Sequence, residues 1–372
     1  MQKYKVMTIF GTRPEAIKMM PVIKELEKIE DIESIVCVTA QHREMLDQVL
    51  EIFDIKPKYD LDVMKDRQTL TGVSVRILEK MDLILNQEKP DLVLVQGDTA
   101  TVLMTSIAAF YNKIKVGHIE AGLRTYNKYE PFPEEMNRKL TGCIADIHFA
   151  PTENAKQNLL KENINEDIIY VTGNTSIDVL AYTIRDEYTF KEEVLNKIDY
   201  KNKKVIVMTA HRRENLGEPL VNICEAALQL ANDNSDVVIV YAVHKNPAVQ
   251  EVALKVLGGH PQIHLIEPLD IEDMHNLMAK CFLVMTDSGG IQEEVPSLGK
   301  PVLVLRNVTE RPEGVEAGTL KLVGTDKEVI INAAQILISD KLEYEKMAQA
   351  NNPFGDGTAG KQIVEIIRRY KV

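Results

Sequence analysis

Tryptophan is absent from the 372-residue sequence, aromatic residues make up only 5%, and there are four cysteines. Cys37, Cys143, Cys224 and Cys281 lie far apart, without the short spacings of zinc sites or redox motifs. Each lies in or beside apolar sequence, which favours packing in the core over a chemical role. We therefore expect reduced cysteines and a cytoplasmic protein.

Long hydrophobic runs are also missing. No apolar stretch approaches the roughly 18 residues that indicate a membrane-spanning helix. The N-terminal apolar run, residues 6–10, ends in Gly-Thr-Arg, which does not fit a signal peptide. A content of 45% hydrophobic and 27% charged residues is typical of soluble globular proteins. We expect no membrane partner.

Positive charge is in deficit, because 44 Lys and Arg against 56 Asp and Glu give a formal net charge of −12. Such a surface repels the phosphate backbone, so we do not expect a nucleic-acid binder. A small anionic ligand is compatible with this charge, because it responds to its local site.

The chain is too long for one ordinary hydrophobic core, so we expect two domains. Short apolar runs alternate with helical patterns throughout, which predicts parallel βαβ units and a doubly wound α/β fold. A charge-rich, strand-poor stretch at about 153–204 indicates a boundary near 172–185, and two such halves predict a cleft between them. The predicted strands are 6–10, 34–39, 92–96, 116–119, 147–150, 205–209, 237–242, 263–266, 282–286, 302–305 and 320–323.

The first predicted strand is followed by GTRPEAIK at residues 11–18. Its single glycine allows a tight turn, and Pro14 suits a first helical turn, but the dinucleotide fingerprint GxGxxG is absent. Arg13 and Lys18 would place two cations at the carboxyl end of the sheet. The alternative is a capping turn with solvated charges.

Carboxylates follow later strands of the first half. Asp98 ends one strand, Glu120 stands between two glycines after the next, and Glu134 opens a helix after Pro133. Helix capping or the helix dipole could account for Asp98 and Glu134 singly. Converging carboxylates raise one another's pKa, so as a set they are candidate acids or bases.

The second half carries anion-binding signals at its strand ends. His211 and Arg212 open the segment HRREN, and His244 ends another strand. In TDSGGIQEE, at residues 286–294, a strand runs through Ser-Gly-Gly into a helix, which presents free backbone N–H groups to a phosphate. Glu294, one turn on, could bind ribose hydroxyls. An ordinary glycine turn is the alternative.

Taken in order, these motifs resemble those of the non-hydrolysing UDP-N-acetylglucosamine 2-epimerases, from about residue 4 to the C-terminus. The resemblance implies a glycosyltransferase-B architecture, with two Rossmann-like domains facing a central cleft. With the boundary above, we expect residues 1–172 to form the domain with the carboxylates and 173–358 the UDP-binding domain, and the resemblance implies that 359–372 form a helix crossing back to the first. The matching segments are GTRPEAIK, TAQHREMLDQVL, GDT, HIEAGLR, FPEEMNR, TGNT, TAHRREN, TDSGGIQEE, PSLGKPVLV, TERPEG and GDG.

The family reaction is the reversible conversion of UDP-N-acetylglucosamine to UDP-N-acetylmannosamine. It proceeds by anti elimination of UDP to 2-acetamidoglucal and re-addition, without metal or NAD. The resemblance further implies a homodimer, activation by a second UDP-N-acetylglucosamine, and a product for cell-surface polysaccharide synthesis. One departure is Gln96, where the family usually has His before GDT, and this places a contact near Asp98 in question.

The resemblance also implies roles for individual residues. We expect Asp98 to take the C2 proton, although the residues leave open which carboxylate does so. The implied catalytic residues are Asp98, Glu120, Glu134 and His211; the implied substrate and UDP contacts are Arg13, Lys18, Arg138, His211, Ser288, Gly289, Gly290 and Glu294; the implied activator contacts are Gln41, Arg67, Gln68, Glu134, Arg212 and His244.

Three other functions stay open at this point. A hydrolysing epimerase would release free N-acetylmannosamine and UDP. A glycosyltransferase would need an acceptor and would not epimerise its donor. A nucleotide-sugar binding or regulatory module would bind UDP without exchange at C2.

Overall fold

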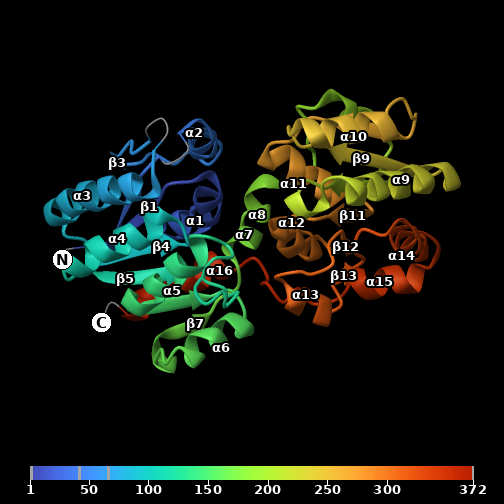
Figure 1. Cartoon of the computed structure of the whole chain (residues 1–372). Helices are drawn as coiled ribbons and strands as arrows, with labels where there is room; N and C mark the ends of the chain where they lie inside the picture. Colours follow the sequence, from blue (N-terminus) through green and yellow to red (C-terminus); the bar gives the residue numbers. More distant parts are fainter. Residues whose placement is uncertain (1–2, 41–42, 65–67, 371–372) are drawn as a thin grey trace. The chain divides into compact units, whose positions relative to one another are not determined.

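A computed structural model describes residues 3–40, 43–64 and 68–370. The chain divides into two compact units: unit 1 is Met1–Val179 with Phe354–Val372, and unit 2 is Leu180–Pro353. Each unit is a parallel sheet with flanking helices (Figure 1). The predicted α/β class with two Rossmann-like units is confirmed, whereas the cleft between them stays a prediction.

The sheet of unit 1 has the strand order β3-β2-β1-β4-β5-β6-β7, with parallel pairing between neighbours. The sequence pattern did not predict the short strands β3 and β7, which lie at the two edges of the sheet. The strands are β1 (Tyr4–Phe10), β2 (Ile32–Val38), β3 (Tyr59–Asp60), β4 (Leu92–Gln96), β5 (Lys115–Ile119), β6 (Ile147–Ala150) and β7 (Ile169–Val171).

The helices of unit 1 follow from local signals. A capping box formed by Thr12 and Glu15, with Pro14 in the first turn, begins α1, and Thr side chains also cap α3 and α6. The helices are α1 (Arg13–Leu26), α2 (Arg43–Ile52), α3 (Leu70–Glu88), α4 (Ala100–Tyr111), α5 (Glu134–Ile144), α6 (Glu153–Lys161), α7 (Thr175–Asp178) and α16 (Ala359–Tyr370).

Unit 2 has the order β10-β9-β8-β11-β12-β13, again parallel. Its strands are β8 (Lys204–Thr209), β9 (Val237–Ala242), β10 (Ile263–Ile266), β11 (Leu283–Thr286), β12 (Val302–Val304) and β13 (Leu320–Leu322). Its α-helices are α8 (Leu180–Thr183), α9 (Glu218–Asp233), α10 (Pro247–Leu257), α11 (Ile271–Lys280), α12 (Gly289–Glu294), α13 (Pro312–Glu316), α14 (Lys327–Ser339) and α15 (Lys341–Ala348).

Each sheet reverses its strand order once. In unit 1 the reversal lies between β1 and β4, and in unit 2 it lies between β8 and β11. At such a point the connections from the two strands run to opposite sides, which opens a crevice beyond their carboxyl ends. The loops that follow these four strands are therefore where ligand-binding side chains are expected.

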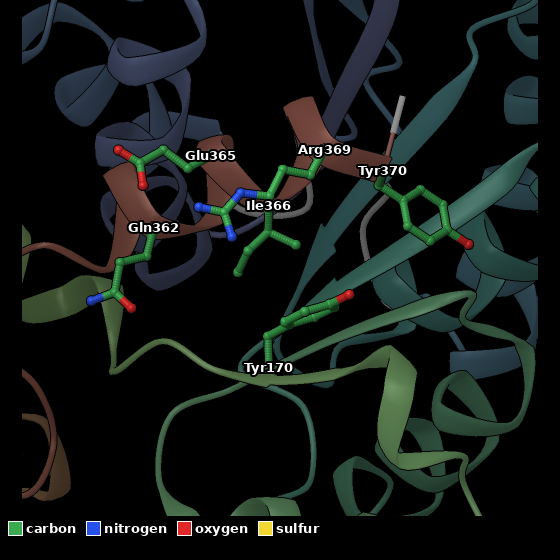
Figure 2. A pocket seen from close by; sticks show the side chains of 6 residues that line it. All are labelled: Tyr170, Gln362, Glu365, Ile366, Arg369 and Tyr370. Carbon is green, nitrogen blue, oxygen red and sulfur yellow. The ribbon is translucent and has the colours of Figure 1, made fainter. Parts of the chain in front are cut away.

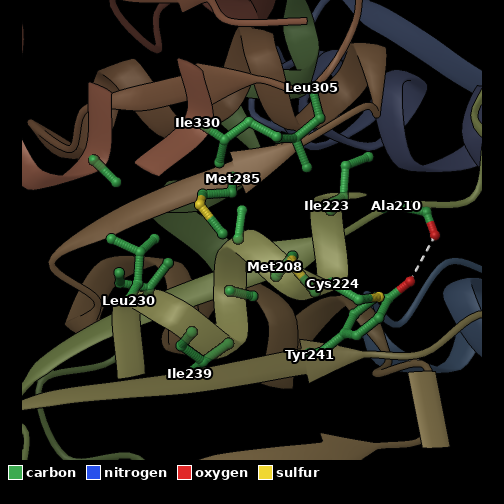
Figure 3. Close-up of a cluster of buried hydrophobic side chains, with 14 of the residues drawn as sticks. Met208, Ala210, Ile223, Cys224, Leu230, Ile239, Tyr241, Met285, Leu305 and Ile330 are labelled. Atoms are coloured by element: carbon green, nitrogen blue, oxygen red, sulfur yellow. Dashed lines mark hydrogen bonds between the residues drawn. The ribbon is translucent and has the colours of Figure 1, made fainter. Parts of the chain in front are cut away.

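The core of unit 2 supports one of these loops directly. Met208, Ile239 and Met285 come from neighbouring strands and are buried together with residues of α9 and α14 (Figure 3). Within this apolar cluster the fully buried Tyr241 donates its hydroxyl to the carbonyl of Ala210 at 2.9 Å. The core thus holds the chain end of β8 immediately before His211.

The last helix returns to unit 1, as predicted. Asp178 at the end of α7 accepts hydrogen bonds from the backbone N–H groups of Ala359 at 3.2 Å and Gly360 at 2.7 Å. A Cβ atom at Gly360 would lie 3.1 Å from Pro21, so α16 packs closely on α1. These contacts explain why the compact units divide at 179/180 and 353/354, not at the expected 172/173 and 358/359.

One expectation about the cysteines was wrong. Cys37, Cys224 and Cys281 are buried free thiols, but Cys143 is exposed. It lies on the face of α5 opposite the buried Arg138 and Thr141, so the apolar sequence around it does not place it inside. Within residues 3–40, 43–64 and 68–370, no helix is long and apolar enough to cross a membrane.

Candidate functional site

Two turns, one after β4 at the reversal of unit 1 and one after the neighbouring strand β5, carry Asp98 and Glu120. Asp98 follows β4 through Gly97, which has a φ of 81°, a conformation that glycine adopts without steric cost. Glu120 follows β5 and itself has a φ of 62°, which is uncommon for a residue with a Cβ. Such backbone strain persists where the surrounding structure holds it, here by contacts to the Glu120 side chain and carbonyl.

Arg138 of α5 joins the two carboxylates. Its guanidinium binds the carboxylate of Asp98, lies 3.2 Å from Oε1 of Glu120, and donates to the Glu120 carbonyl oxygen. Burial alone would lower the pKa of Arg138, but the charges of Asp98 and Glu120 outweigh it and raise that pKa above its ordinary value. Arg138 is therefore a permanent buried cation between two acids.

Glu120 has further donors on its second oxygen. Lys18 of α1 forms an ion pair with Oε2 of Glu120, and the Gln96 amide donates to the same atom at 3.0 Å. Gln96, the departure from the family pattern, thus contacts Glu120. The side chain of Glu120 is 8% exposed, whereas that of Asp98 is 28% exposed. Asp98 is the more accessible of the two carboxylates.

Glu15 is a residue of this site that the sequence reasoning missed. Its buried carboxylate accepts hydrogen bonds at 2.8 Å from the backbone N–H groups of Gly11 and Thr12, and one at 2.5 Å from the hydroxyl of Thr99. Burial raises the pKa of Glu15, and these hydrogen bonds oppose the rise. Glu15 therefore ties the turn after β1 to the turn that carries Asp98. The capping-box pattern of Thr12 and Glu15 was the available signal.

His118 forms a hydrogen bond with the same turn. Its Nε2 lies 2.7 Å from the carbonyl oxygen of Gly97, and the side chain is fully buried. Burial, aided by the charge of Arg138, lowers the pKa of His118 to about 3. The neutral ring therefore donates its Nε2 proton to Gly97, which fixes the backbone next to Asp98.

Two predicted residues of unit 1 lie at helix starts. Arg13, the first residue of α1, is exposed, and Glu134, the first residue of α5, is half-buried. Neither has a hydrogen bond or ion pair to Asp98, Glu120 or Arg138 within the described residues. Their roles stay predictions.

In unit 2 the corresponding loops meet at Asp287, which follows β11 and is fully buried. Its Oδ2 accepts hydrogen bonds from the backbone N–H groups of His211 at 2.7 Å and Arg212 at 2.8 Å, and from the side-chain amide of Asn215 at 3.0 Å. Asp287 therefore shapes the loop after β8 and sets the start of the HRREN segment.

His211 is the titratable group that the loop after β8 places beside Asp287. Its Nδ1 lies 3.4 Å from Oδ1 of Asp287, and its ring stacks on that of the exposed His244, with centroids 5.3 Å apart and planes at 12°. Burial lowers the pKa of His211, and Asp287 opposes this while His244 and Arg212 add to it.

The Ser-Gly-Gly turn begins α12, with Ser288 as the N-cap residue. A Cβ atom at Gly289 would lie 3.1 Å from the guanidinium carbon of Arg311, so glycine lets that side chain approach. Arg311 pairs with Glu293 at 2.8 Å. Glu294 lies 3.4 Å from Nε2 of His275. The early N–H groups of a helix have no partner within it, so this turn can donate to an anion.

The predicted activator contacts divide between the units. Gln41 and Arg67 lie outside the described residues. In unit 1, the side-chain carbonyl of Gln68 accepts a hydrogen bond from Arg76. Glu134 is also in unit 1, whereas Arg212 and His244 belong to the His211 loop region of unit 2 described above.

Surface depressions elsewhere contain none of the predicted site residues. One of about 400 Å³ is lined by Tyr170 of β7 and by α16, including Arg369 and Tyr370 (Figure 2). Another, of about 630 Å³, lies along β10 and α10. Across the described ranges, no group of three or more His, Cys, Asp or Glu side chains could hold a metal ion.

Comparison with known proteins places the chain in a family. The model of the UDP-N-acetylglucosamine 2-epimerase family matches residues 24–368. The chain belongs to this epimerase family. UDP-N-acetylglucosamine 2-epimerase of Bacillus subtilis strain 168 is 58% identical to it over 98% of this chain and 95% of the relative. The Escherichia coli K12 enzyme of the same name is 50% identical, over 99% of each chain.

Solved structures of the family share the fold. The Neisseria meningitidis UDP-GlcNAc 2-epimerase bound to UDP-GlcNAc has a TM-score of 0.86 and 51% identity, covering 98% of this chain and all of that one. The Methanocaldococcus jannaschii epimerase in complex with UDP-GlcNAc and UDP has a TM-score of 0.78 and 36% identity, covering 98% and 99%. The predicted family, fold class and epimerase class are confirmed.

Proposed function

We propose that this chain interconverts UDP-N-acetylglucosamine and UDP-N-acetylmannosamine by anti elimination of UDP and its re-addition. The observation that carries the proposal is the Asp98–Arg138–Glu120 group of unit 1, in a chain 58% identical to a 2-epimerase. Two carboxylates held by one buried guanidinium at the ends of neighbouring strands are suited to proton transfer beside a developing positive charge.

The chemistry sets the requirements for the site. The C2–H bond is not adjacent to a carbonyl, so it becomes acidic only as the C1–O bond breaks. The electron pair of C1–O leaves with the β-phosphate oxygen, the C2 proton passes to a carboxylate, and a C1–C2 double bond forms. Re-addition of UDP reverses each change after the proton has been returned to the other face of C2. Both an oxocarbenium-like sugar and a diphosphate need stabilisation.

Asp98 is our candidate for the group that takes the C2 proton. It is more exposed than Glu120 and has Arg138 as its charged partner, whereas Glu120 is engaged by Lys18, Gln96 and Arg138. These donors hold the Glu120 carboxylate in place, so we assign Glu120 the role of stabilising positive charge at C1. Glu134 and Arg138 complete the proposed group.

UDP is proposed to bind to unit 2. The backbone N–H groups of the Ser288-Gly289-Gly290 turn would donate to its phosphates and Glu294 would bind the ribose. His211 would donate to the leaving diphosphate oxygen, with Arg13 and Lys18 of unit 1 as further cations. A relative 51% identical to this chain has been solved bound to UDP-GlcNAc, which supports this ligand.

The finer expectations belong to the same proposal. A second UDP-N-acetylglucosamine would activate the enzyme through the predicted contacts, among them Gln68, Arg212 and His244. The reaction would need neither metal nor NAD, the enzyme would be a homodimer, and its product would serve cell-surface polysaccharide synthesis.

Incubation with UDP-N-acetylglucosamine in D2O tests the mechanism. We expect deuterium at C2 in the product and in recovered substrate, with UDP-N-acetylmannosamine as the main product by NMR. Free N-acetylmannosamine as the main product would identify a hydrolysing epimerase. UDP binding without deuterium at C2 would contradict elimination and leave a glycosyltransferase or a binding module.

A further inference from the structure

Asp287 combines complete burial with an incomplete set of partners. Its Oδ2 accepts three hydrogen bonds, whereas its Oδ1 accepts none from the described residues, although Nδ1 of His211 lies 3.4 Å from it. Buried carboxylate oxygens normally have donors, so an unpartnered one requires an explanation. The nearest candidate donor is the ring of His211.

The loop around His211 is held independently of this ring contact. The backbone N–H groups of His211 and Arg212 bind Oδ2, and Asn215 donates both to Oδ2 and, at 3.0 Å, to the carbonyl of Leu305. Tyr241 fixes the carbonyl of Ala210 just before the loop. One oxygen of Asp287 therefore shapes the backbone, which leaves the other for the imidazole.

We infer that Asp287 is a positioning residue that holds His211 in the Nδ1–H tautomer and so presents Nε2 to the leaving diphosphate. This inference rests on the proposed function of His211. A carboxylate can only accept, so the nitrogen facing it must carry the proton. Nε2, across the ring, is then the atom that exchanges a proton with a ligand. A distance of 3.4 Å in the free enzyme is compatible with this role, because catalytic hydrogen bonds often tighten only in the complex.

The charged groups around His211 fit a ring that is neutral when free and becomes a donor when a diphosphate binds. Asp287 after β11, His244 at the end of β9 and Arg212 on the same loop face it. Burial lowers the pKa of His211, and Asp287 opposes that fall. A bound diphosphate would add negative charge on the side of Nε2. The imidazolium would then lie between two anions and could donate to the departing oxygen.

The test is 15N NMR of the full-length protein with labelled histidine, using His211→Gln to identify the His211 signals. In the wild-type enzyme without ligand, above the pKa of His211, we expect the Nδ1–H tautomer, although free imidazole side chains favour Nε2–H. Addition of UDP should raise the pKa of His211. A wild-type His211 in the Nε2–H tautomer would overturn the inference without any variant of Asp287.

Two variants separate positioning from loop stability. Asp287→Asn should shift His211 toward the Nε2–H tautomer, lower its pKa, and reduce kcat on the order of 10²-fold or more with little change in KM, as for other acid–histidine pairs. Asn215→Ala removes the hydrogen bonds to Oδ2 of Asp287 and to the Leu305 carbonyl but leaves Oδ1 facing His211, so it should reduce stability while keeping the wild-type tautomer. If Asp287→Asn leaves the tautomer and the pKa unchanged, Asp287 serves the loop alone.

The outcomes also distinguish this inference from the proposed function. The tautomer is measured without substrate, so it can be confirmed even if the D2O experiment fails. Conversely, C2 exchange by the wild-type enzyme with His211 in the Nε2–H form would retain the epimerase and reject the positioning role of Asp287.

Discussion

Units 1 and 2 each use a buried acid to hold the loop after a strand of the reversal, but the charged groups around the two loops differ. In each, a buried acid binds two successive backbone N–H groups of the loop that follows one strand of the reversal: Glu15 for Gly11 and Thr12, and Asp287 for His211 and Arg212. In unit 1 this acid also binds Thr99, next to Asp98, and the carboxylates of Asp98 and Glu120 are paired with Arg138 and Lys18. In unit 2 the loops carry an imidazole and a glycine turn.

Under the proposed mechanism, this difference would let one fold serve two parts of one reaction. The topology supplies the converging loops in both units, while the side chains decide whether the crevice suits proton transfer or an anion. Unit 1 holds two carboxylates with the buried Arg138 and the partly exposed Lys18, and unit 2 has backbone N–H donors beside the buried Asp287. The predictions below test this division.

The largest expected effect is on turnover. Asp98→Asn keeps the shape but removes the base, so kcat should fall about 10³-fold, in the range for loss of a general base, while UDP affinity is largely spared. Epimerisation assays and calorimetry with UDP measure the two. The matched change in unit 2, Glu294→Gln, should instead weaken UDP binding. Equal loss of turnover and UDP affinity in Asp98→Asn would mark Asp98 as a binding or folding residue.

The buried cation of unit 1 should dominate its stability. Arg138→Met leaves Asp98 and Glu120 without their shared partner, so the free energy of unfolding should fall by about 3 kcal/mol. Hydrogen exchange resolved by unit should assign the loss to unit 1. As a control, Lys24→Met removes the surface pair with Glu27 and should cost less than about 0.5 kcal/mol. A similar loss for both variants would contradict the special role of Arg138.

Acid should weaken unit 1 more than unit 2. Burial lowers the pKa of His118 to about 3 and that of His148 to about 4, so both rings are neutral when folded. They bind protons only on unfolding. Burying the neutral rings therefore costs no stability above the unfolded pKa of about 6.5, and the folded state loses stability as pH falls below that value. Between pH 7 and pH 5 we expect each of these histidines to lower the free energy of unfolding of unit 1 by about 2 kcal/mol. His211 and His264 of unit 2 are more exposed and should contribute less.

Hydrogen exchange at pH 7 and pH 5 measures the loss of stability in each unit. One variant tests the assignment to a single histidine. His148→Leu should remove one histidine's share of the acid sensitivity of unit 1 and leave unit 2 unchanged. Equal acid sensitivity in the wild-type units would contradict the assignment to these buried rings.

The smallest expected effect concerns the core beneath the His211 loop. Tyr241→Phe leaves the Ala210 carbonyl without its donor and should cost about 1 kcal/mol of unit 2 stability. Because the loop is also held by Asp287, kcat should change by less than in Asp98→Asn. Thermal unfolding and the epimerisation assay check both, and a larger kcat loss than in Asp98→Asn would show that the core, not Asp287, sets the position of His211.

The sequence was most informative where its patterns are local. The runs at 92–96 and 147–150 predicted β4 and β6 at their observed bounds, because buried parallel strands are uninterrupted apolar segments. The acids after strands drew attention to Asp98 and Glu120. The function of Glu15 was missed, because a capping box also occurs in ordinary helices. Its long-range bond to Thr99 has no local signature.

Asp287 illustrates the same limit in unit 2. It stood in the motif around Ser288, but its partners His211 and Asn215 are more than seventy residues earlier in the chain. Arg138 was expected at the substrate, and only the packing of α5 beside the ends of β4 and β5 shows that it binds Asp98 and Glu120. Which side chains share a crevice depends on strand order, which alternating patterns do not encode.

The amino-acid sequence alone determined the α/β class, most of the strands and helices, and the residue types available for proton transfer and anion binding. These depend on local periodicity, capping and turn chemistry. The tertiary structure decided that β1 lies beside β4 and β8 beside β11, and therefore that Glu15 meets Thr99 and Asp287 meets His211. The physical reason is that charge pairing and burial act over a few ångströms in space, whatever the separation along the chain.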